Sequence, residues 1–247
     1  MIYITGDTHR EIDIWKINPD DGFPKGKELT DKDYVLICGD FGCIWDGAQG
    51  DAFWLKWLES LPWTTLFVDG NHENFDVLNN YPIMEWHGGL VHRIRYNVLH
   101  LMRGQVFEIE GKNFFTFGGA FSHDRVMRTE HKNWWQDEMP IKEEIERAHI
   151  NLNKVNWKVD YVISHDVYSN HSLSKKYEAS MGYYDKKYFN VQKVLEEIRN
   201  KLNYEIWFTG HYHIDYVEMT DNKPCVTLFN FVLNLNDIEN EIKEHFE

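Results

Sequence analysis

Cysteine is scarce in this chain, and the few cysteines are not spaced for a bridge framework. The 247 residues include only Cys38, Cys43 and Cys225, an odd number with no Cys-x-x-Cys pair. Disulfide scaffolds and thiolate zinc knuckles both need regularly spaced cysteines, so we expect neither. Free thiols indicate a reducing compartment.

Positive charge is also in short supply. The chain has 26 Lys and Arg against 40 Asp and Glu, which gives a formal net charge of −14. Broad, non-specific binding of nucleic acid depends on neutralising phosphates with Lys and Arg, so this class of partner is not expected. A local positive site made by metal ions is compatible with the same balance.

Signals for secretion and for membrane insertion are absent as well. Residues 1–7 lack the basic region and long apolar run of a signal peptide. No apolar run approaches the ~20 residues that a membrane span needs. We therefore expect a cytoplasmic protein without a membrane partner. No internal repeat or linker divides the sequence, which predicts a single domain over residues 1–247.

Short apolar runs of the kind found in buried strands recur along the chain. They lie at residues 2–4, 33–38, 66–68, 159–164 and 206–209. The first three alternate with crossover segments, which favours a parallel sheet. Shorter strand-like runs lie at 98–102, 105–109 and 113–117. The spacing of the last two indicates a hairpin and hence a mixed or second sheet. Strands at 216–219 and 226–228 are expected to close the fold.

Helices and loops are expected between these strands. Helical spacing of apolar residues predicts helices over 52–61 and 141–152, and Asn190 is a good N-cap for a third helix. Pro and Gly between residues 19 and 26 indicate a surface loop. The polar and aromatic segment 168–188 is expected to be a loop or lid.

Polar side chains follow five of the strands, where each strand ends. These residues are Asp7, His9, Asp40, Asn71, His72, His165, His211 and His213. The carboxyl ends of strands in an α/β sheet are where ligand sites are built, so we expect these side chains to converge. On an extended backbone the i, i+2 pairs Asp7/His9 and His211/His213 would each point to one face.

The donor types in this set indicate a metal centre. Oxygen and imidazole nitrogen without thiolate suit divalent Mn, Fe, Zn, Co or Ni. A set of this size has too many donors for one tetrahedral ion and suits two ions. Two neighbouring ions can stabilise both the attacking and the leaving oxygen of a displacement.

The order of these motifs resembles that of the calcineurin-like dinuclear metallophosphoesterases. The motifs are Asp7-x-His9, Gly39-Asp40, Gly70-Asn71-His72-Glu73, a strand-end His165 and Gly210-His211-x-His213. The resemblance implies a four-layer α/β/β/α sandwich with two mixed β-sheets, and two divalent metal ions as cofactors. It also implies that Asp7, His9 and His213 hold one ion, that Asn71, His165 and His211 hold the other, and that Asp40 bridges them. His72 is not a ligand in the family and would protonate the leaving oxygen.

The sequence departs from the family pattern near Asp40. Many members continue Gly-Asp-x-x-Asp, often with Arg next, but this chain has Cys43 and Ile44 at those places. The absent acid often orients the catalytic histidine, and Asp46 is the alternative on spacing. His165 is followed by Asp-Val-Tyr instead of small residues, so His171 competes with it as a ligand.

Candidates for substrate contact lie in the loop 118–128. Arg125 and His123, with Arg128, follow a strand and could reach a phosphate, which Arg binds in a bidentate manner. The alternative is a solvated loop with its own ion pairs. Trp134 and Trp135 are expected to be core bulk or to shape the pocket. Six other histidines are expected to be structural: His87, His92, His100, His131, His149 and His245.

The function expected from the resemblance is hydrolysis of phosphate esters by a metal-bridging hydroxide. The substrate would be a phosphorylated small molecule, a nucleotide or a phosphoprotein, and a phosphomonoesterase is favoured. The alternatives are a phosphodiesterase acting on cyclic or nucleotide diesters, and an inactive scaffold that binds proteins or metal.

Overall fold

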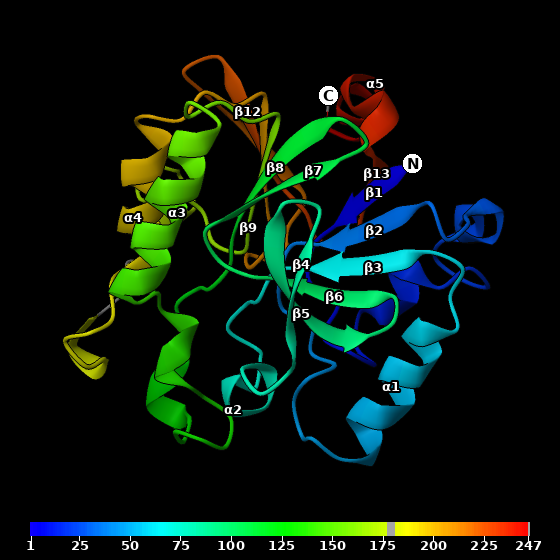
Figure 1. Ribbon diagram of the computed structural model, residues 1–247, viewed down its shortest axis with the longest axis horizontal. Coiled ribbons are helices and arrows are strands. Elements are labelled where there is room, and N and C mark those ends of the chain that lie inside the picture. Colours follow the sequence, from blue (N-terminus) through cyan, green and yellow to red (C-terminus); the bar gives the residue numbers. More distant parts are fainter. Residues whose placement is uncertain (177–180, 247) are drawn as a thin grey trace.

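Two β-sheets packed face to face form the centre of the computed structural model (Figure 1), which describes residues 1–176 and 181–246. The seven-stranded sheet contains, in spatial order, β13 (Val232–Asn234), β1 (Ile2–Thr5), β2 (Tyr34–Ile37), β3 (Thr64–Phe67), β6 (Val98–Leu101), β5 (Gly89–Arg95) and β4 (Ile83–Trp86). The six-stranded sheet contains β11 (Tyr216–Thr220), β12 (Lys223–Thr227), β10 (Ile206–Thr209), β9 (Tyr161–Ser164), β8 (Lys112–Phe117) and β7 (Gln105–Ile109).

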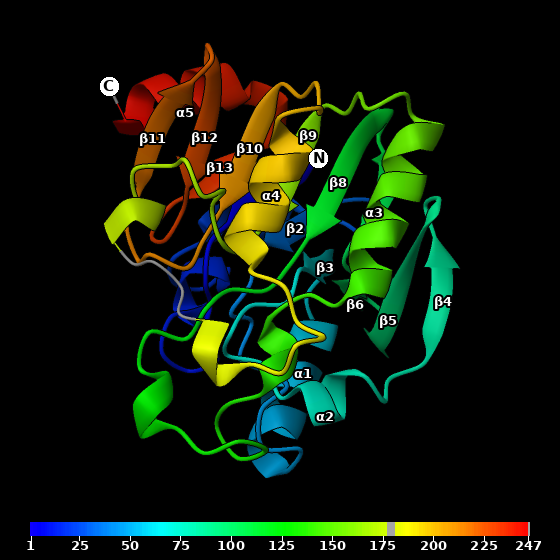
Figure 2. The same ribbon diagram turned by 90° about the vertical axis from the view of Figure 1, so that its left-hand side faces the viewer.

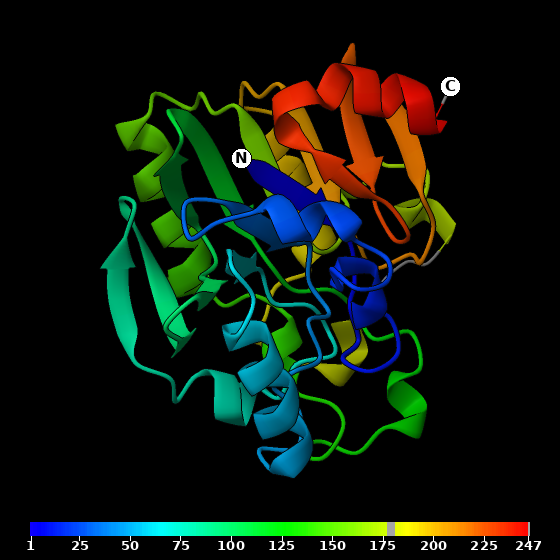
Figure 3. The same cartoon turned by 90° about the vertical axis from the view of Figure 1, so that its right-hand side faces the viewer.

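Helices cover the outer face of each sheet, and the last helix packs against the core between the sheets. They are α1 (Gln49–Glu59), α2 (Phe75–Leu78), α3 (Lys142–Lys154), α4 (Val191–Arg199) and α5 (Ile238–Phe246). In Figure 2, α3 and α4 lie over the six-stranded sheet, and in Figure 3, α1 lies on the opposite side of the molecule. The expected four-layer α/β/β/α sandwich with two mixed sheets is therefore confirmed.

Three apolar clusters fill the three gaps between these layers. Ile4, Leu36 and Leu66, which are cross-strand neighbours, face Ile163 and Phe208 of the other sheet. Residues one position along β1, β2 and β3 point to the opposite face, as the alternation of a strand requires. That face packs on α1, and a third cluster packs the six-stranded sheet on α3 and α4.

Parallel pairing aligns the carboxyl ends of the central strands. β1, β2, β3 and β6 run parallel in one sheet, and β8, β9, β10 and β12 run parallel in the other. Thr5, Ile37 and Phe67 are paired neighbours, so the residues that follow them emerge at one edge. The predicted hairpin is also confirmed, since β7 and β8 pair antiparallel.

The expected end of the fold was wrong. Strand β13 follows β12 and pairs antiparallel with β1, and α5 follows β13. Ile238, Ile242 and Phe246 recur every four residues on α5 and pack against the core between the sheets. A strand of three residues gives too short a pattern to predict. Its pairing is also hidden from local sequence, because its neighbour in the sheet is the chain's first strand.

The segment between β1 and β2 is in part the surface loop that Pro and Gly indicate. Most of residues 19–26 are exposed or half-buried. The 3₁₀ helix Ile14–Ile17 precedes this loop, and Ile14, Ile17 and Phe23 are buried in the cluster under α1, so these side chains anchor the segment to the sheet.

The predicted helices form with shifted ends. The helix expected over 52–61 is α1, and the helix expected over 141–152 is α3. Asn190 caps α4, since its side-chain oxygen accepts a hydrogen bond from the Lys193 amide. None of the described helices has the length and apolar character to cross a bilayer.

Candidate metal centre

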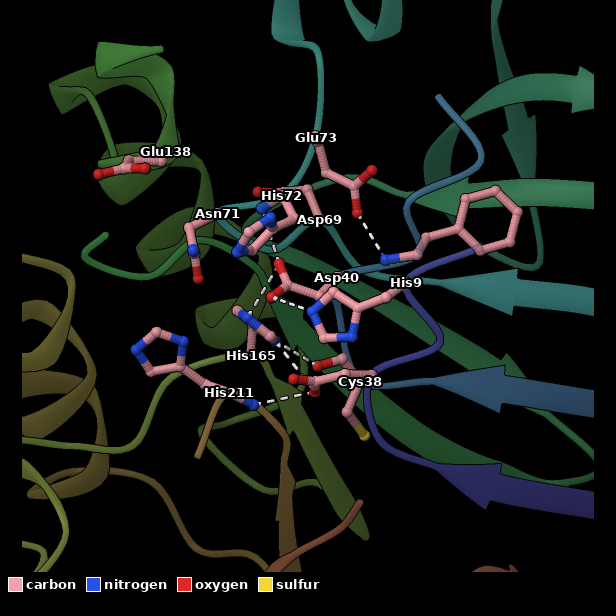
Figure 4. Close-up of polar contacts among 12 residues, drawn as sticks. His9, Cys38, Asp40, Asp69, Asn71, His72, Glu73, Glu138, His165 and His211 are labelled. Atoms are coloured by element: carbon pink, nitrogen blue, oxygen red, sulfur yellow. Dashed lines mark hydrogen bonds and ion pairs between the residues drawn. The ribbon is translucent and has the colours of Figure 1, made fainter. Parts of the chain in front are cut away.

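The polar strand ends of both sheets meet in one place. Asp7 and His9 follow β1, Asp40 follows β2, and Asn71 follows β3, all from the seven-stranded sheet. His165 follows β9, and His211 and His213 follow β10 of the six-stranded sheet. Figure 4 shows the side chains of His9, Asp40, Asn71, His165 and His211 around one small volume. The site therefore lies between the two sheets and takes donors from each.

The donor atoms form two groups that share Asp40. In the first, donor atoms of Asp7, His9, Asp40 and His213 all lie within 4.8 Å of one another. In the second, donor atoms of Asp40, His165 and His211 do so.

Each oxygen of Asp40 faces a different group. Its Oδ2 lies 3.2 Å from Nε2 of His9, and its Oδ1 lies 3.2 Å from Nε2 of His165. A carboxylate in this position is suited to bridge two ions.

Four buried donor atoms make no hydrogen bond among the described residues. They are Asp7 Oδ2, Asn71 Oδ1, His165 Nε2 and His211 Nε2. A buried polar atom without a hydrogen bond costs about 1–3 kcal/mol. His165 Nε2 and Asp7 Oδ2 lie against Asp40 and His213 of the same site, so the four atoms together indicate a binding partner. Carboxylate, amide and imidazole donors of this kind could hold divalent transition-metal ions.

Outer hydrogen bonds fix which imidazole nitrogen faces the site. His9 Nδ1 lies 2.8 Å from Asp13 Oδ2, and His165 Nδ1 lies 2.7 Å from the carbonyl oxygen of Cys38. Each contact turns Nε2 toward Asp40, as the outer partners of metal-binding histidines do. Asp13 was missed in the sequence, although its position four residues after His9 is a signal.

Close packing explains two of the glycines in the motifs. A Cβ at Gly70 would lie 2.1 Å from Asp40 Oδ1, and a Cβ at Gly210 would lie 2.1 Å from Asp7 Oδ1. Any larger residue would displace the carboxylates, so the glycine before each histidine motif gives the acids their places.

The backbone of the ligand segments is strained and not extended. His9, Asp40, His211 and His213 have φ values of +36°, +46°, +70° and +51°. The expectation that His211 and His213 share one face of an extended segment was wrong, and the two rings enter different donor groups. Left-handed non-glycine residues are costly and cluster at functional sites.

Electrostatics at the site favour a cation. Burial alone would raise the pKa of Asp40, but the neighbouring His165, His72 and His9 hold it well below its ordinary value. Burial would lower the pKa of His165, yet Asp40 and Asp7 raise it to about 10. The two buried carboxylates thus make a field that stabilises positive charge, whether on imidazolium or on a metal ion.

His72 lies beside Asp40 but outside both donor groups. Its backbone amide donates to Asp40 Oδ1 at 2.7 Å, and its ring stacks on Trp45 at a centroid distance of 6.0 Å. Arg128 Nη2 lies 3.0 Å from His72 Nε2. Burial, together with the positive charge of Arg128, lowers the pKa of His72 despite the opposing charge of Asp40.

The His72 ring is oriented neither by Cys43, which stands at the place of the family's acid, nor by the alternative Asp46. Cys43 is fully buried in the cluster under α1, where burial raises the pKa of its thiol. Asp46 pairs with Arg10 at 2.9 Å. Trp45 and Arg128 instead contact the ring of His72.

A cavity of about 330 Å³ opens in front of these groups. It is lined by Asp40, Asn71, His72, His123, Asp124, Arg128, His211, Tyr212 and His213. His123 stacks on His211 at 5.1 Å. Arg125 does not line this cavity, because its guanidinium lies 3.5 Å from the centre of the Trp134 ring. Of the two arginines in this loop, Arg128 lines the cavity and Arg125 does not.

The competing histidine and the aromatic segments lie away from the cavity. His171 Nδ1 lies 3.8 Å from Glu218 and belongs to neither donor group. Trp134 and Trp135 are buried, which places them in the core. Tyr177 lies outside the described residues. The Asp-Val-Tyr run after His165 is accommodated, since Asp166 accepts a hydrogen bond from the Tyr212 hydroxyl at 2.8 Å.

Lys16 is a further residue that sequence reasoning missed. Its side chain is buried, and its amine donates hydrogen bonds to the carbonyl oxygens of Asp7 and Phe229. It therefore holds the backbone of Asp7 in place. No motif marks it, because it lies in the short 3₁₀ helix Ile14–Ile17, between the first strand-end motif and the turn-rich stretch 19–26.

Comparison with proteins of curated function finds no matching sequence. Among solved structures, the chain is similar to GAP50, the anchor in the inner membrane complex of Plasmodium, with 13% identity and a TM-score of 0.46, covering 92% of this chain and 70% of that one. It is also similar to the phosphopantetheinyl hydrolase of Mycobacterium tuberculosis, with 12% identity and a TM-score of 0.44, covering 100% and 92% of the two chains.

Sequence comparison with protein families is more direct. The model of the calcineurin-like phosphoesterase family matches residues 1–215, a span that contains every motif described above. The chain belongs to the calcineurin-like phosphoesterase family, whose members are hydrolases of phosphate esters.

Proposed function

We propose that the chain is a metal-dependent phosphomonoesterase that uses two divalent ions. The observation that carries the proposal is the position of Asp40, whose two oxygens face two separate groups of donors. Asp7, His9 and His213 would hold one ion, and Asn71, His165 and His211 the other. Mn, Fe, Zn, Co and Ni all suit these donors.

When bound, the ions would make a hydroxide available near neutral pH and would neutralise phosphate oxygens. The chain's own residues supply binding and proton transfer. Arg128 points into the cavity and can contact a phosphate oxygen, which is the pairing that guanidinium favours. His72 lines the same cavity and can donate a proton to the departing oxygen.

Arg128 and His72 must act in sequence. In the free protein the guanidinium of Arg128 lies against His72 Nε2, which leaves that nitrogen without a proton. A phosphate would draw Arg128 away, and its negative charge would favour protonation of His72. Substrate binding thus prepares His72 for its role.

The size of the cavity supports a monoester of a small molecule or a nucleotide. About 330 Å³ accommodates a phosphoryl group and a modest alcohol. A phosphoprotein would have to present its phosphorylated side chain to the same cavity.

A second hollow supports the diester alternative. It has a volume of about 130 Å³, adjoins His72 on the side of Trp45, and is lined by His9, Arg10, Glu11, Ile12, Gly42, Trp45 and His72. A second ester group could occupy it, so a diesterase is the rival function.

A substrate panel on metal-loaded protein separates these functions. The purified chain is reconstituted with Mn²⁺ and assayed on para-nitrophenyl phosphate and on bis(para-nitrophenyl) phosphate. We expect the larger kcat/KM on the monoester. A larger value on the diester would support the rival. No bound metal and no turnover with Mn, Fe, Zn, Co or Ni would support an inactive scaffold.

A further inference from the structure

Glu138 is a fully buried carboxylate beside the candidate metal centre. It lies at the end of the 3₁₀ helix Gln136–Glu138 and accepts hydrogen bonds from four donors. Its Oε1 accepts from the Ser122 amide at 3.1 Å, from Trp134 Nε1 at 2.8 Å and from the Tyr184 hydroxyl, and its Oε2 accepts from Ser122 Oγ at 2.6 Å. Figure 4 shows the carboxylate beyond Asn71, on the side away from His165.

Ser122 links Glu138 to Asn71 by hydrogen bonds and determines which end of the Asn71 amide faces it. A serine hydroxyl has one hydrogen to donate, and here that hydrogen goes to Glu138. Only the lone pairs of Ser122 Oγ remain, so Asn71 has to present its NH₂ group, and Asn71 Nδ2 lies 3.3 Å from Ser122 Oγ. The amide oxygen of Asn71 then points the other way, where it is buried without a hydrogen bond among the described residues.

We propose that Glu138 is a positioning residue that, through Ser122, fixes the amide of Asn71 so that its oxygen is presented to the second metal ion. The inference depends on the proposed function, since it needs a metal at Asp40, His165 and His211. The ligand is a divalent cation. The Tyr184 hydroxyl donates a hydrogen bond to the same carboxylate and so attaches its own segment to Glu138.

The substitution Glu138→Gln would allow the hydrogen bonds from residue 138 through Ser122 to Asn71 to reverse their donors and acceptors. A Gln amide can donate to Ser122 Oγ, which frees the serine hydrogen to donate to the oxygen of Asn71. The Asn71 amide could then rotate and turn its NH₂ group, which cannot bind a cation, toward the ion.

The backbone of the loop after β3 is held independently of Glu138's side chain. Arg103 donates from Nε to Asp69 Oδ2 at 2.8 Å and from Nη2 to the carbonyl oxygen of Asp137 at 2.7 Å. Changing the carboxylate of Glu138 therefore leaves this attachment in place, and its effect on metal binding can be separated from loss of the loop.

The test is a titration of metal-free protein with Mn²⁺ in the absence of substrate, with binding measured by isothermal titration calorimetry. It is done at pH 8, because burial raises the pKa of Glu138 to about 7. We expect the unsubstituted chain to bind two equivalents. In Glu138→Gln and in Ser122→Ala, one equivalent should bind as before and the other about 10–100-fold more weakly.

Glu144→Gln is the matched control. Glu144 pairs with Arg103 at 3.2 Å and accepts from the Ile141 amide, but has no contact with Ser122. It should bind both equivalents as the unsubstituted chain does. Thermal unfolding checks that each variant is folded, and Ser122→Ala decides the matter if Glu138→Gln is not.

Two results would overturn the inference while the metal proposal stands. One is unchanged Mn²⁺ affinity for both equivalents in folded Glu138→Gln and Ser122→Ala. The other is an equal loss of Mn²⁺ affinity in Glu144→Gln. An unsubstituted chain that binds no Mn²⁺ would overturn the proposed function itself, and this inference with it.

Discussion

His72 is the residue whose chemistry is most separable from metal binding. Its backbone amide donates to Asp40, and its ring contacts Arg128, Trp45 and the edge of the His9 ring without entering either donor group. His72→Ala should therefore retain both metals. Turnover of alkyl esters should fall ~10²–10⁴-fold, because a poor leaving group needs a proton, while aryl esters should lose less.

The measurement is kcat on an alkyl and an aryl phosphate, with metal content determined on the same sample. An equal loss on both esters would count against the general-acid role of His72.

Arg128 and Arg125 provide a paired test of phosphate contact. Arg128 lines the cavity, whereas Arg125 stacks on Trp134. Arg128→Ala should raise KM for an aryl phosphate about 10–100-fold, the loss of one charge-assisted contact. Arg125→Ala should raise it much less. Steady-state kinetics on both variants decide this, and the opposite order would return the role to Arg125.

At this scale the sequence indicates which residues meet at strand ends but not how a loop turns its side chains. Asp40 and His165 follow buried strands, and their convergence could be predicted from placement alone. Arg125 and Arg128 lie in one loop. Arg125 stacks on Trp134, which leaves Arg128 to line the cavity, and this choice depends on tertiary packing that the loop sequence does not show. Glu138 carries no motif, because its partners Ser122 and Tyr184 are distant in sequence.

The pairing of β5 with β6 brings two buried histidines into contact. His92 Nδ1 lies 2.9 Å from His100 Nδ1, and His100 Nε2 lies 3.0 Å from Asp69. Burial, with the neighbouring His100, lowers the pKa of His92 to about 4. Neither histidine belongs to a donor group of the candidate metal centre.

This pair makes stability depend on pH. Between pH ~6.5 and ~4 the unfolded chain protonates His92 while the folded chain keeps it neutral, so the free energy of unfolding decreases as the pH falls. The contribution should be about 1–2 kcal/mol after solvent screening. His92→Gln should flatten this slope in urea unfolding at several pH values. Identical slopes in both proteins would contradict this origin.

Elements with long or near-continuous apolar patterns could be predicted, and short ones could not. β1, β2 and β3 are covered on both faces, and the parallel order follows from their apolar runs. β4 has alternating exposed and half-buried residues at the sheet's edge and carries little signal. The strand at 98–102 was expected, but not its neighbours: β6 pairs parallel with β3 and antiparallel with β5. Such pairing depends on distant contacts that local pattern does not encode.

At the scale of the whole molecule, the candidate metal centre lies between the two sheets. Asp7, His9, Asp40 and Asn71 come from one sheet, and His165, His211 and His213 from the other. Bound ions would therefore join the two halves of the sandwich. The pairing of these halves follows from the inter-sheet apolar cluster, which the sequence indicates only as a set of inward-facing positions.

Metal should accordingly stabilise the fold. Mn²⁺ at 100 times its Kd should add about 2.7 kcal/mol to the free energy of unfolding, which raises Tm by roughly 5–10 °C. Mg²⁺ should stabilise less, because it prefers oxygen ligands and this site is rich in imidazole. Thermal unfolding with each ion, and with a chelator added, checks this. Equal shifts with Mg²⁺ and Mn²⁺ would contradict the assignment of the donors.

Metal content and turnover, measured together on the unsubstituted chain and on Asp40→Asn, test the central claim most directly. The unsubstituted chain should bind two Mn²⁺ and hydrolyse para-nitrophenyl phosphate, and Asp40→Asn should lose metal and turnover together. Full metal occupancy in Asp40→Asn, or a fully loaded chain that hydrolyses no phosphate ester, would contradict it.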